Sequence, residues 1–220
     1  MKDEKQRVAL VSIFAAVLIT GMKLIVGVLT GSLGILSEAL HSGLDLVATA
    51  VTYFAVRMAD KPADKHHTYG HGKVENLSAL FETLLLVITS FWIIYEAIQR
   101  LLGAEFEIEV TFWSFLVMIV SIVVDWLRSR ALLKVAKKHN SQALEADALH
   151  FSTDIWSSAV VIVGLVGSLL GYPGADAIAA LAVALIVLWV CFNMGKRSID
   201  VLLDKAPVEE TKAIAEALDQ

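Results

Sequence analysis

The sequence predicts an all-α membrane protein, a six-transmembrane-helix bundle with both termini in the cytoplasm. Three observations support this prediction: the composition, six long apolar runs, and basic residues gathered on one side of those runs. Hydrophobic residues make up 57% of the chain and charged residues 19%, with a mean hydropathy of +0.68, which excludes an ordinary soluble domain. The net charge of -5 indicates little about partners, because the charges are sorted by position.

Six apolar runs are long enough to cross a bilayer as helices. They lie at about Val8–Thr30, Ile35–Arg57, Leu77–Leu101, Val110–Leu133, Leu144–Leu170 and Ala175–Leu203. The first run is too long for a signal peptide and contains no small-residue cleavage site. The connections Thr30–Gly34 and Gly171–Gly174 are short and rich in glycine. They therefore predict antiparallel helical hairpins.

The positions of lysine and arginine predict the orientation of the bundle. By the positive-inside rule, the side of the membrane that carries most basic residues is the cytoplasmic side. Here that side also holds both termini, and Arg100 lies on the other side. The basic residues placed inside are 16 of the 18 in the chain: Lys2, Lys5, Arg7, Arg57, Lys61, Lys65, Lys73, Arg128, Arg130, Lys134, Lys137, Lys138, Lys196, Arg197, Lys205 and Lys212.

A His-x-x-x-Asp motif occurs twice, as His41 and Asp45 in the second run and as His150 and Asp154 in the fifth. On a helix this spacing places both side chains on one face. Ionisable groups inside a membrane usually face a protein interior or a water-filled cavity. Two imidazoles and two carboxylates suit tetrahedral Zn(II) or a similar divalent ion. The alternative is that each histidine only hydrogen-bonds its own aspartate within a packed bundle.

Other charged residues also lie in the apolar runs or at their edges. Asp125 and Arg128 are three residues apart, which predicts a local ion pair on a helix surface. Glu82 and Asp147 are expected to line the cytoplasmic approach to the His-x-x-x-Asp motifs, without being ligands. The single cysteine, Cys191, excludes both an intramolecular disulfide and a cysteine-rich metal site.

The two motifs and the loop sequence DKHHTYGHGKVE at residues 64–75 resemble the cation diffusion facilitator family of divalent-metal transporters. The resemblance covers nearly the whole chain. It implies efflux of a divalent metal in exchange for protons, by a homodimer, with four ligands from the second and fifth spans. A histidine in the second span resembles the zinc-preferring arrangement, so Zn(II) is the expected substrate. The implied transport ligands are His41, Asp45, His150 and Asp154.

The resemblance also implies a second metal site in the loop after the second span. Its ligands would be Asp64, His67 and His71. The His67 and His71 spacing suits a helix, but Gly70 and Gly72 favour a turn. His66 could replace one ligand, and the alternative is a solvated histidine-rich loop that binds no metal.

A charge latch between Lys73 and Asp204 is a further expectation from the resemblance, and it would tie the cytoplasmic ends of the bundle together. The alternative is two solvated charges. Residues 1–206 are expected to form the transmembrane domain. Residues 207–220 look like the first helix of a cytoplasmic ferredoxin-like domain, so the domain looks truncated relative to that family.

Two classes of function fit these observations. The first is a proton-coupled exporter that works by alternating access, which is not an enzyme and resides in a membrane, expected to be a bacterial inner membrane. Its substrate is expected to be zinc, with iron, manganese or cadmium as alternatives within the family. The second is an intramembrane zinc-dependent hydrolase, which is disfavoured because no His-Glu-x-x-His motif is present. We expect divalent metal ions, lipid and a second copy of the chain as partners, and no nucleic acid.

Overall fold

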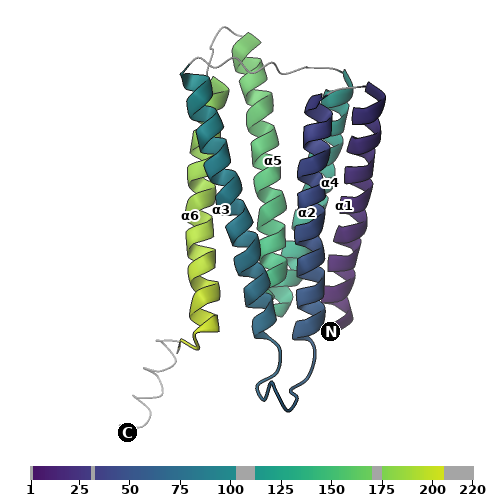
Figure 1. Cartoon of the computed structure of the whole chain (residues 1–220), viewed down its shortest axis with the longest axis vertical. Coiled ribbons are helices and arrows are strands. Elements are labelled where there is room, and N and C mark those ends of the chain that lie inside the picture. The colour runs from purple at the N-terminus through teal and green to yellow at the C-terminus, as the bar shows by residue number, and fades with distance from the viewer. Residues whose placement is uncertain (1, 31–32, 103–111, 170–174, 206–220) are drawn as a thin grey trace.

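A computed structural model describes residues 2–30, 33–102, 112–169 and 175–205, and the structure discussed below is that of these residues. They form six helices and thereby confirm the predicted all-α fold (Figure 1). The helices are α1 (Lys2–Thr30), α2 (Leu33–Ala59), α3 (Lys73–Leu101), α4 (Phe112–His139), α5 (Gln142–Leu169) and α6 (Ala175–Leu202). Residues 207–220, expected to begin a further domain, lie outside the described residues.

Four of these helices contain segments that are long and apolar enough to cross a membrane, within the part of the chain that the structure describes. These segments are Glu4–Leu29, Ala39–Ala59, Lys73–Gln99 and Ala180–Leu202. The other two helices, α4 and α5, are not among these candidate spans, and each holds charged residues within its apolar run, such as Arg128 and Asp147. The chain is therefore a membrane protein, and the crossing of the bilayer by α4 and α5 stays a prediction.

The turn between α4 and α5 shows how local sequence sets a helix boundary. Asn140 has a positive φ of 50°, the left-handed conformation that often ends a helix. The Ser141 N–H then donates to the Ala136 carbonyl at 3.0 Å. The Ser141 hydroxyl accepts a bond from the Leu144 N–H at 3.4 Å, as an N-cap residue does. A single short turn therefore joins two antiparallel helices.

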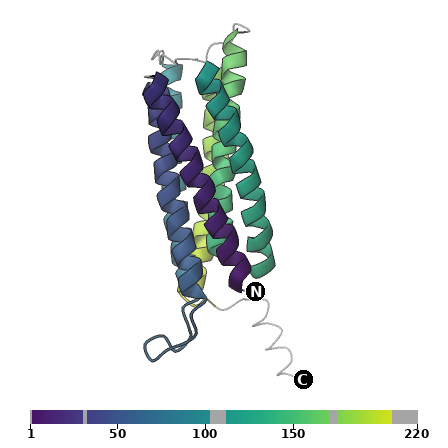
Figure 2. The same cartoon turned by 90° about the vertical axis from the view of Figure 1, so that its right-hand side faces the viewer.

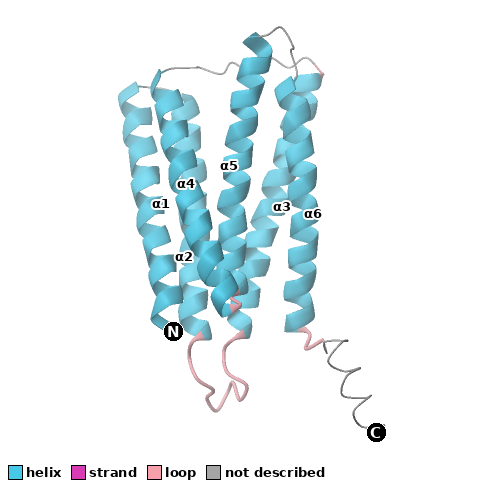
Figure 3. Ribbon diagram, turned by 180° about the vertical axis from the view of Figure 1, so that it is seen from behind, coloured by secondary structure: helices cyan, strands magenta, loops and turns pink. Residues whose placement is uncertain are grey.

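The bundle is organised around α5, which packs against α2, α3, α4 and α6. On one side α3 packs on α6, and on the other α1 packs on α2 and α4, as the view from behind shows (Figure 3). Figure 2 turns the side with α1, α2 and α4 towards the viewer. The N-terminus and the loop of residues 60–72 lie at the same end of the bundle (Figure 1). We call this the loop end. It is the end that the basic residues predict to be cytoplasmic.

The interior of the bundle is unusually polar for a small helical protein. The fully buried side chains include the polar groups of Thr49, Thr52, Glu82 and Asp147. Large apolar residues such as Leu18, Leu29 and Trp189 instead lie on the outside. A lipid environment explains this inversion, because polar groups in membrane proteins face the protein interior while apolar side chains face the acyl chains.

Candidate metal-binding sites

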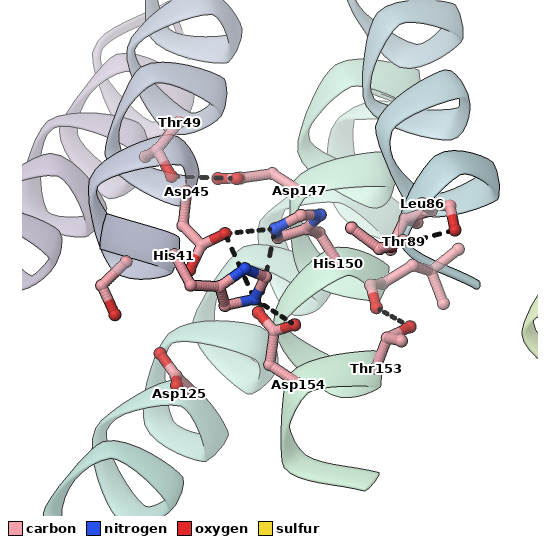
Figure 4. A network of polar contacts seen from close by, with 12 residues as sticks. His41, Asp45, Thr49, Leu86, Thr89, Asp125, Asp147, His150, Thr153 and Asp154 are labelled. Atoms are coloured by element: carbon pink, nitrogen blue, oxygen red, sulfur yellow. Dashed lines mark hydrogen bonds and ion pairs between the residues drawn. The ribbon is translucent and has the colours of Figure 1, made fainter. Parts of the chain in front are cut away.

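Helices α2 and α5 cross the bundle in opposite directions and bring the two His-x-x-x-Asp motifs together (Figure 4). The closest contact joins His150 Nε2 to Asp45 Oδ1 at 2.9 Å. His150 Nε2 also lies 3.8 Å from Asp154 Oδ2. His41 Nε2 lies 3.9 Å from Asp154 Oδ1 and 4.0 Å from Asp45 Oδ1. We call these four residues the His–Asp site.

Each histidine of the His–Asp site contacts both aspartates, and the shortest contact runs between the helices. This differs from the alternative in which each histidine only bonds the aspartate of its own motif. Four ligands at ~2.1 Å from a tetrahedral zinc ion are separated by roughly 3.4 Å. The four contacts above fall on both sides of this value, so small side-chain movements suffice to enclose an ion.

His41 differs from the other three members of the site. Single ligand atoms of Asp45, His150 and Asp154 all lie within 4.8 Å of one another, and His41 is outside this tight group. Its side chain is 43% exposed, whereas that of His150 is 4% exposed. The site therefore has a closed side at His150 and an open side at His41.

Arg128 and Asp125 form the predicted ion pair, at 3.2 Å, but the prediction of a helix-surface position was wrong. The Arg128 side chain is only 7% exposed, because α1 packs on α4 and α5 covers the same region. Its guanidinium donates to Ser12 at 3.1 Å and to Thr49 at 3.3 Å. It also lies 3.6 Å from the centre of the Phe151 ring, a cation–π contact.

Thr49 and Thr52 belong to the polar interior, and sequence reasoning missed both. Thr49 donates to Asp147 at 3.2 Å, and Thr52 donates to Glu82. A signal was present in the sequence, since positions 45, 49 and 52 share one face of a helix at i, i+4 and i+7. Lys23 of α1 is also buried in the polar interior, and its Nζ donates to Ser42 Oγ at 2.8 Å.

The loop at residues 60–72 brings Asp64, His67 and His71 together, and we call these residues the loop cluster. Their ligand atoms lie within 4.8 Å of one another. Asp64 Oδ1 is 3.2 Å from His67 Nδ1, and Asp64 Oδ2 is 3.6 Å from His71 Nε2. The segment is not helical, and Gly70 has a φ of +83°, which favours glycine. The predicted turn is therefore confirmed.

Asp64 organises the loop cluster through backbone hydrogen bonds. Its Oδ1 accepts bonds from the N–H groups of His67 at 2.7 Å and of His66 at 2.8 Å. These bonds lower the pKa of Asp64 below its ordinary value, because they stabilise the charged carboxylate. His66 thus contributes a backbone N–H here, and its side chain is not part of the cluster.

Lys73 and Asp204, the predicted latch residues, form an ion pair of 2.6 Å between Nζ and Oδ2. Lys73 Nζ also donates to the Leu202 carbonyl at 3.1 Å. The contact connects the start of α3 to the end of α6. Both side chains are well exposed, at 49% and 79%, so solvent screens the attraction. The pair exists, and its role as a latch stays a prediction.

The fold and the convergent ligand sets indicate a membrane transporter of metal cations, and comparison with known proteins identifies the family. The family model described as "Cation efflux transmembrane domain" matches residues 9–203. The chain therefore belongs to the cation efflux family, that is, the cation diffusion facilitators. It is a transporter of divalent metal cations and not an enzyme, which removes the alternative of a hydrolase.

Named relatives match over most of the chain. An uncharacterised transporter of Methanocaldococcus jannaschii is 38% identical over 204 residues, covering 93% of this chain and 72% of the relative. The cation-efflux pump FieF of Cronobacter sakazakii is 31% identical over 96% of this chain and 70% of its own. The magnetosome protein MamB of Magnetospirillum gryphiswaldense is 30% identical, with 93% and 69% covered.

Proposed function

We propose that this chain exports zinc from the cytoplasm by alternating access, using the His–Asp site as the transport site and protons as counter-ions. The observation that carries the proposal is the approach of both motifs across α2 and α5, with His150 Nε2 2.9 Å from Asp45 Oδ1. Two nitrogen and two oxygen donors are a ligand set that zinc favours. Iron, manganese and cadmium are the alternatives within the family.

The buried position of the site explains how transport and proton exchange can be coupled. Without a cation, two aspartates in a membrane interior carry a charge that is costly to bury. A bound zinc ion reduces that cost, and so do protons on the histidines and aspartates. Protonation of an imidazole removes the lone pair that binds metal. Zinc and protons therefore compete for the same groups, which is the requirement for exchange.

The position of the site between two helices suits a change of access. The ligands lie on α2 and α5, and each helix extends to both ends of the bundle. A small tilt of one helix against the other therefore opens one end of the site and closes the opposite end. We further propose that the loop end faces the cytoplasm, that the protein is a homodimer, and that it resides in a bacterial inner membrane.

The loop cluster is proposed as a second metal site. Its three ligand atoms approach within 4.8 Å, and an ionised Asp64 adds a negative charge. Because the cluster is exposed, water can complete the coordination of an ion there. We assign it no direct part in translocation, since it lies in a loop outside the apolar interior of the bundle.

Zinc flux into proteoliposomes tests the proposed function. We expect saturable zinc flux by the wild-type protein, driven by an opposed proton gradient, and no saturable flux by Asp154→Ala. Asp200→Asn is the matched control, because Asp200 pairs with Lys205 at 2.7 Å beyond the site. The control should retain wild-type flux. Normal zinc flux by Asp154→Ala would refute the assignment of the site.

A further inference from the structure

Glu82 and Asp147 are buried carboxylates that the transport site does not use. Both have 0% exposure. Glu82 is on α3 and Asp147 is on α5, and these helices pack on each other and on α2. Each carboxylate accepts a hydrogen bond from a threonine of α2, Glu82 from Thr52 and Asp147 from Thr49. We call Glu82 and Asp147 the acidic pair.

Each member of the acidic pair has one carboxylate oxygen without a partner. Among the residues that the structure describes, Glu82 Oε2 and Asp147 Oδ2 are buried and make no hydrogen bond. Neither carboxylate has a lysine, arginine or histidine within ion-pair distance in the described part of the chain. A buried carboxylate oxygen that lacks a donor costs free energy. A bound cation would supply the partner that these oxygens lack.

The acidic pair lies between the His–Asp site and the loop end. Thr49 and Thr52 follow Asp45 by four and seven residues along α2, which places them roughly 6 and 10 Å nearer the loop end at 1.5 Å per residue. Asp147 precedes His150 by three residues on α5, which runs in the opposite direction. Both helices thus extend the polar stripe from the site towards the same end.

We propose that Glu82 and Asp147, with the hydroxyl groups of Thr49 and Thr52, form an all-oxygen binding site for a divalent cation on the loop-end side of the His–Asp site. Ser78 of α3 lies beside these groups, with its hydroxyl 3.5 Å from that of Thr52. Oxygen ligands suit hard cations and bind zinc less well than a set with imidazoles. An ion from the cytoplasm would bind weakly here and then move to the stronger site.

This inference rests on the proposed function only because it takes the His–Asp site as the destination of the ion. Binding to the acidic pair can be measured separately with Mn(II), which prefers oxygen ligands. The full chain in lipid nanodiscs is used, with Asp154→Ala and His67→Ala as a background that disables the other two candidate sites. Bound and free Mn(II) are then distinguished by electron paramagnetic resonance.

We expect the background protein to bind one Mn(II) ion per chain. Adding Glu82→Gln or Asp147→Asn should weaken binding at least about tenfold, which corresponds to ~1.4 kcal/mol. Both changes replace a carboxylate by an amide of the same shape, so they retain the acceptor for the threonine hydroxyl. Glu145→Gln is the control, because Glu145 is a carboxylate of α5 that pairs with Arg197 at the bundle surface. It should leave Mn(II) binding unchanged.

Transport gives a second measurement in the otherwise wild-type protein. If the acidic pair receives the incoming ion, Glu82→Gln raises the KM for zinc about tenfold and changes the maximal rate much less. If Asp147→Asn does not fold, Glu82→Gln alone decides. The inference is overturned if the protein with Asp154→Ala and His67→Ala binds no Mn(II). It is also overturned if adding Glu82→Gln to that protein leaves Mn(II) binding equal. Normal zinc flux by Asp154→Ala refutes the proposed function instead and leaves the Mn(II) result intact.

Discussion

The His–Asp site and the loop cluster use the same two residue types, but different structures hold them. In the first, the contact between Asp45 and His150 joins residues 105 positions apart on two long helices. In the second, all three residues fall within eight positions of one loop. The His150 side chain is 4% exposed and that of His67 is 56% exposed. The comparison separates a site made by the fold from a site made by a turn.

This difference has energetic consequences. Charges in the buried site interact through a medium of low polarity, so an absent partner is costly and an ion is bound strongly. Charges in the loop are screened by water, and Asp64 is already stabilised by backbone N–H groups. Loss of one ligand should therefore be severe in the His–Asp site and mild in the loop cluster. The following predictions test this contrast.

The largest effect is expected when one carboxylate is removed from each site. Asp45→Ala should lower saturable zinc flux at least about 100-fold, because Asp45 contacts both histidines and a three-ligand site binds zinc weakly. Asp64→Ala should retain flux within about twofold, since the loop is outside the bundle interior. Flux assays on both variants, after gel filtration confirms folding, check this contrast. Equal losses of flux would remove it.

A smaller effect is expected on metal selectivity. Wild type should transport Zn(II) in strong preference to Mn(II), and His41→Asp should reduce this preference, because an imidazole nitrogen is replaced by an oxygen donor. His41 is the exposed member of the site, so the change should be tolerated by the fold. Competition between zinc, cadmium, iron and manganese is the measurement. An unchanged ranking of the metals would show that His41 does not set selectivity.

The loop cluster should control metal stoichiometry more than transport. His71→Ala should remove one weakly bound zinc ion per chain in equilibrium dialysis, since His71 Nε2 approaches Asp64 at 3.6 Å. His66→Ala is the matched control, because only its backbone N–H contributes to the cluster. It should leave the stoichiometry unchanged. If both variants bind as much zinc as wild type, the loop is a solvated segment without a metal.

The smallest effect is expected at the contact between Lys73 and Asp204. Exposed ion pairs contribute ~0–1 kcal/mol, so Lys73→Ala should lower the melting temperature by a few degrees at most. The effect should decrease in high salt, because salt screens exposed charges. A double-mutant cycle with Asp204→Ala measures the coupling between the two residues. A coupling that persists in high salt would contradict this view of the pair.

The helices and the His–Asp site could be predicted from sequence for specific reasons. Apolar runs report helix positions directly, and the spacing of His150 and Asp154 places both on one helix face. The burial of Arg128 could not be predicted, because it depends on which helices pack against α4. The roles of Thr49 and Thr52 were missed for a related reason, since a threonine in an apolar run has no distinctive pattern.

The sequence by itself predicted the all-α class, the two His-x-x-x-Asp motifs and the turn at Gly70, and the family resemblance supplied the candidate ligands of the loop cluster. These features depend on local composition and on contacts between near neighbours in the chain. Only the tertiary structure decided that His150 meets Asp45 across two helices and that His41 lies on the open side. It also placed Glu82 and Asp147 beside threonines of α2. Such contacts depend on how helices pack, and packing is set by side-chain shapes over the whole bundle rather than by spacing along one segment.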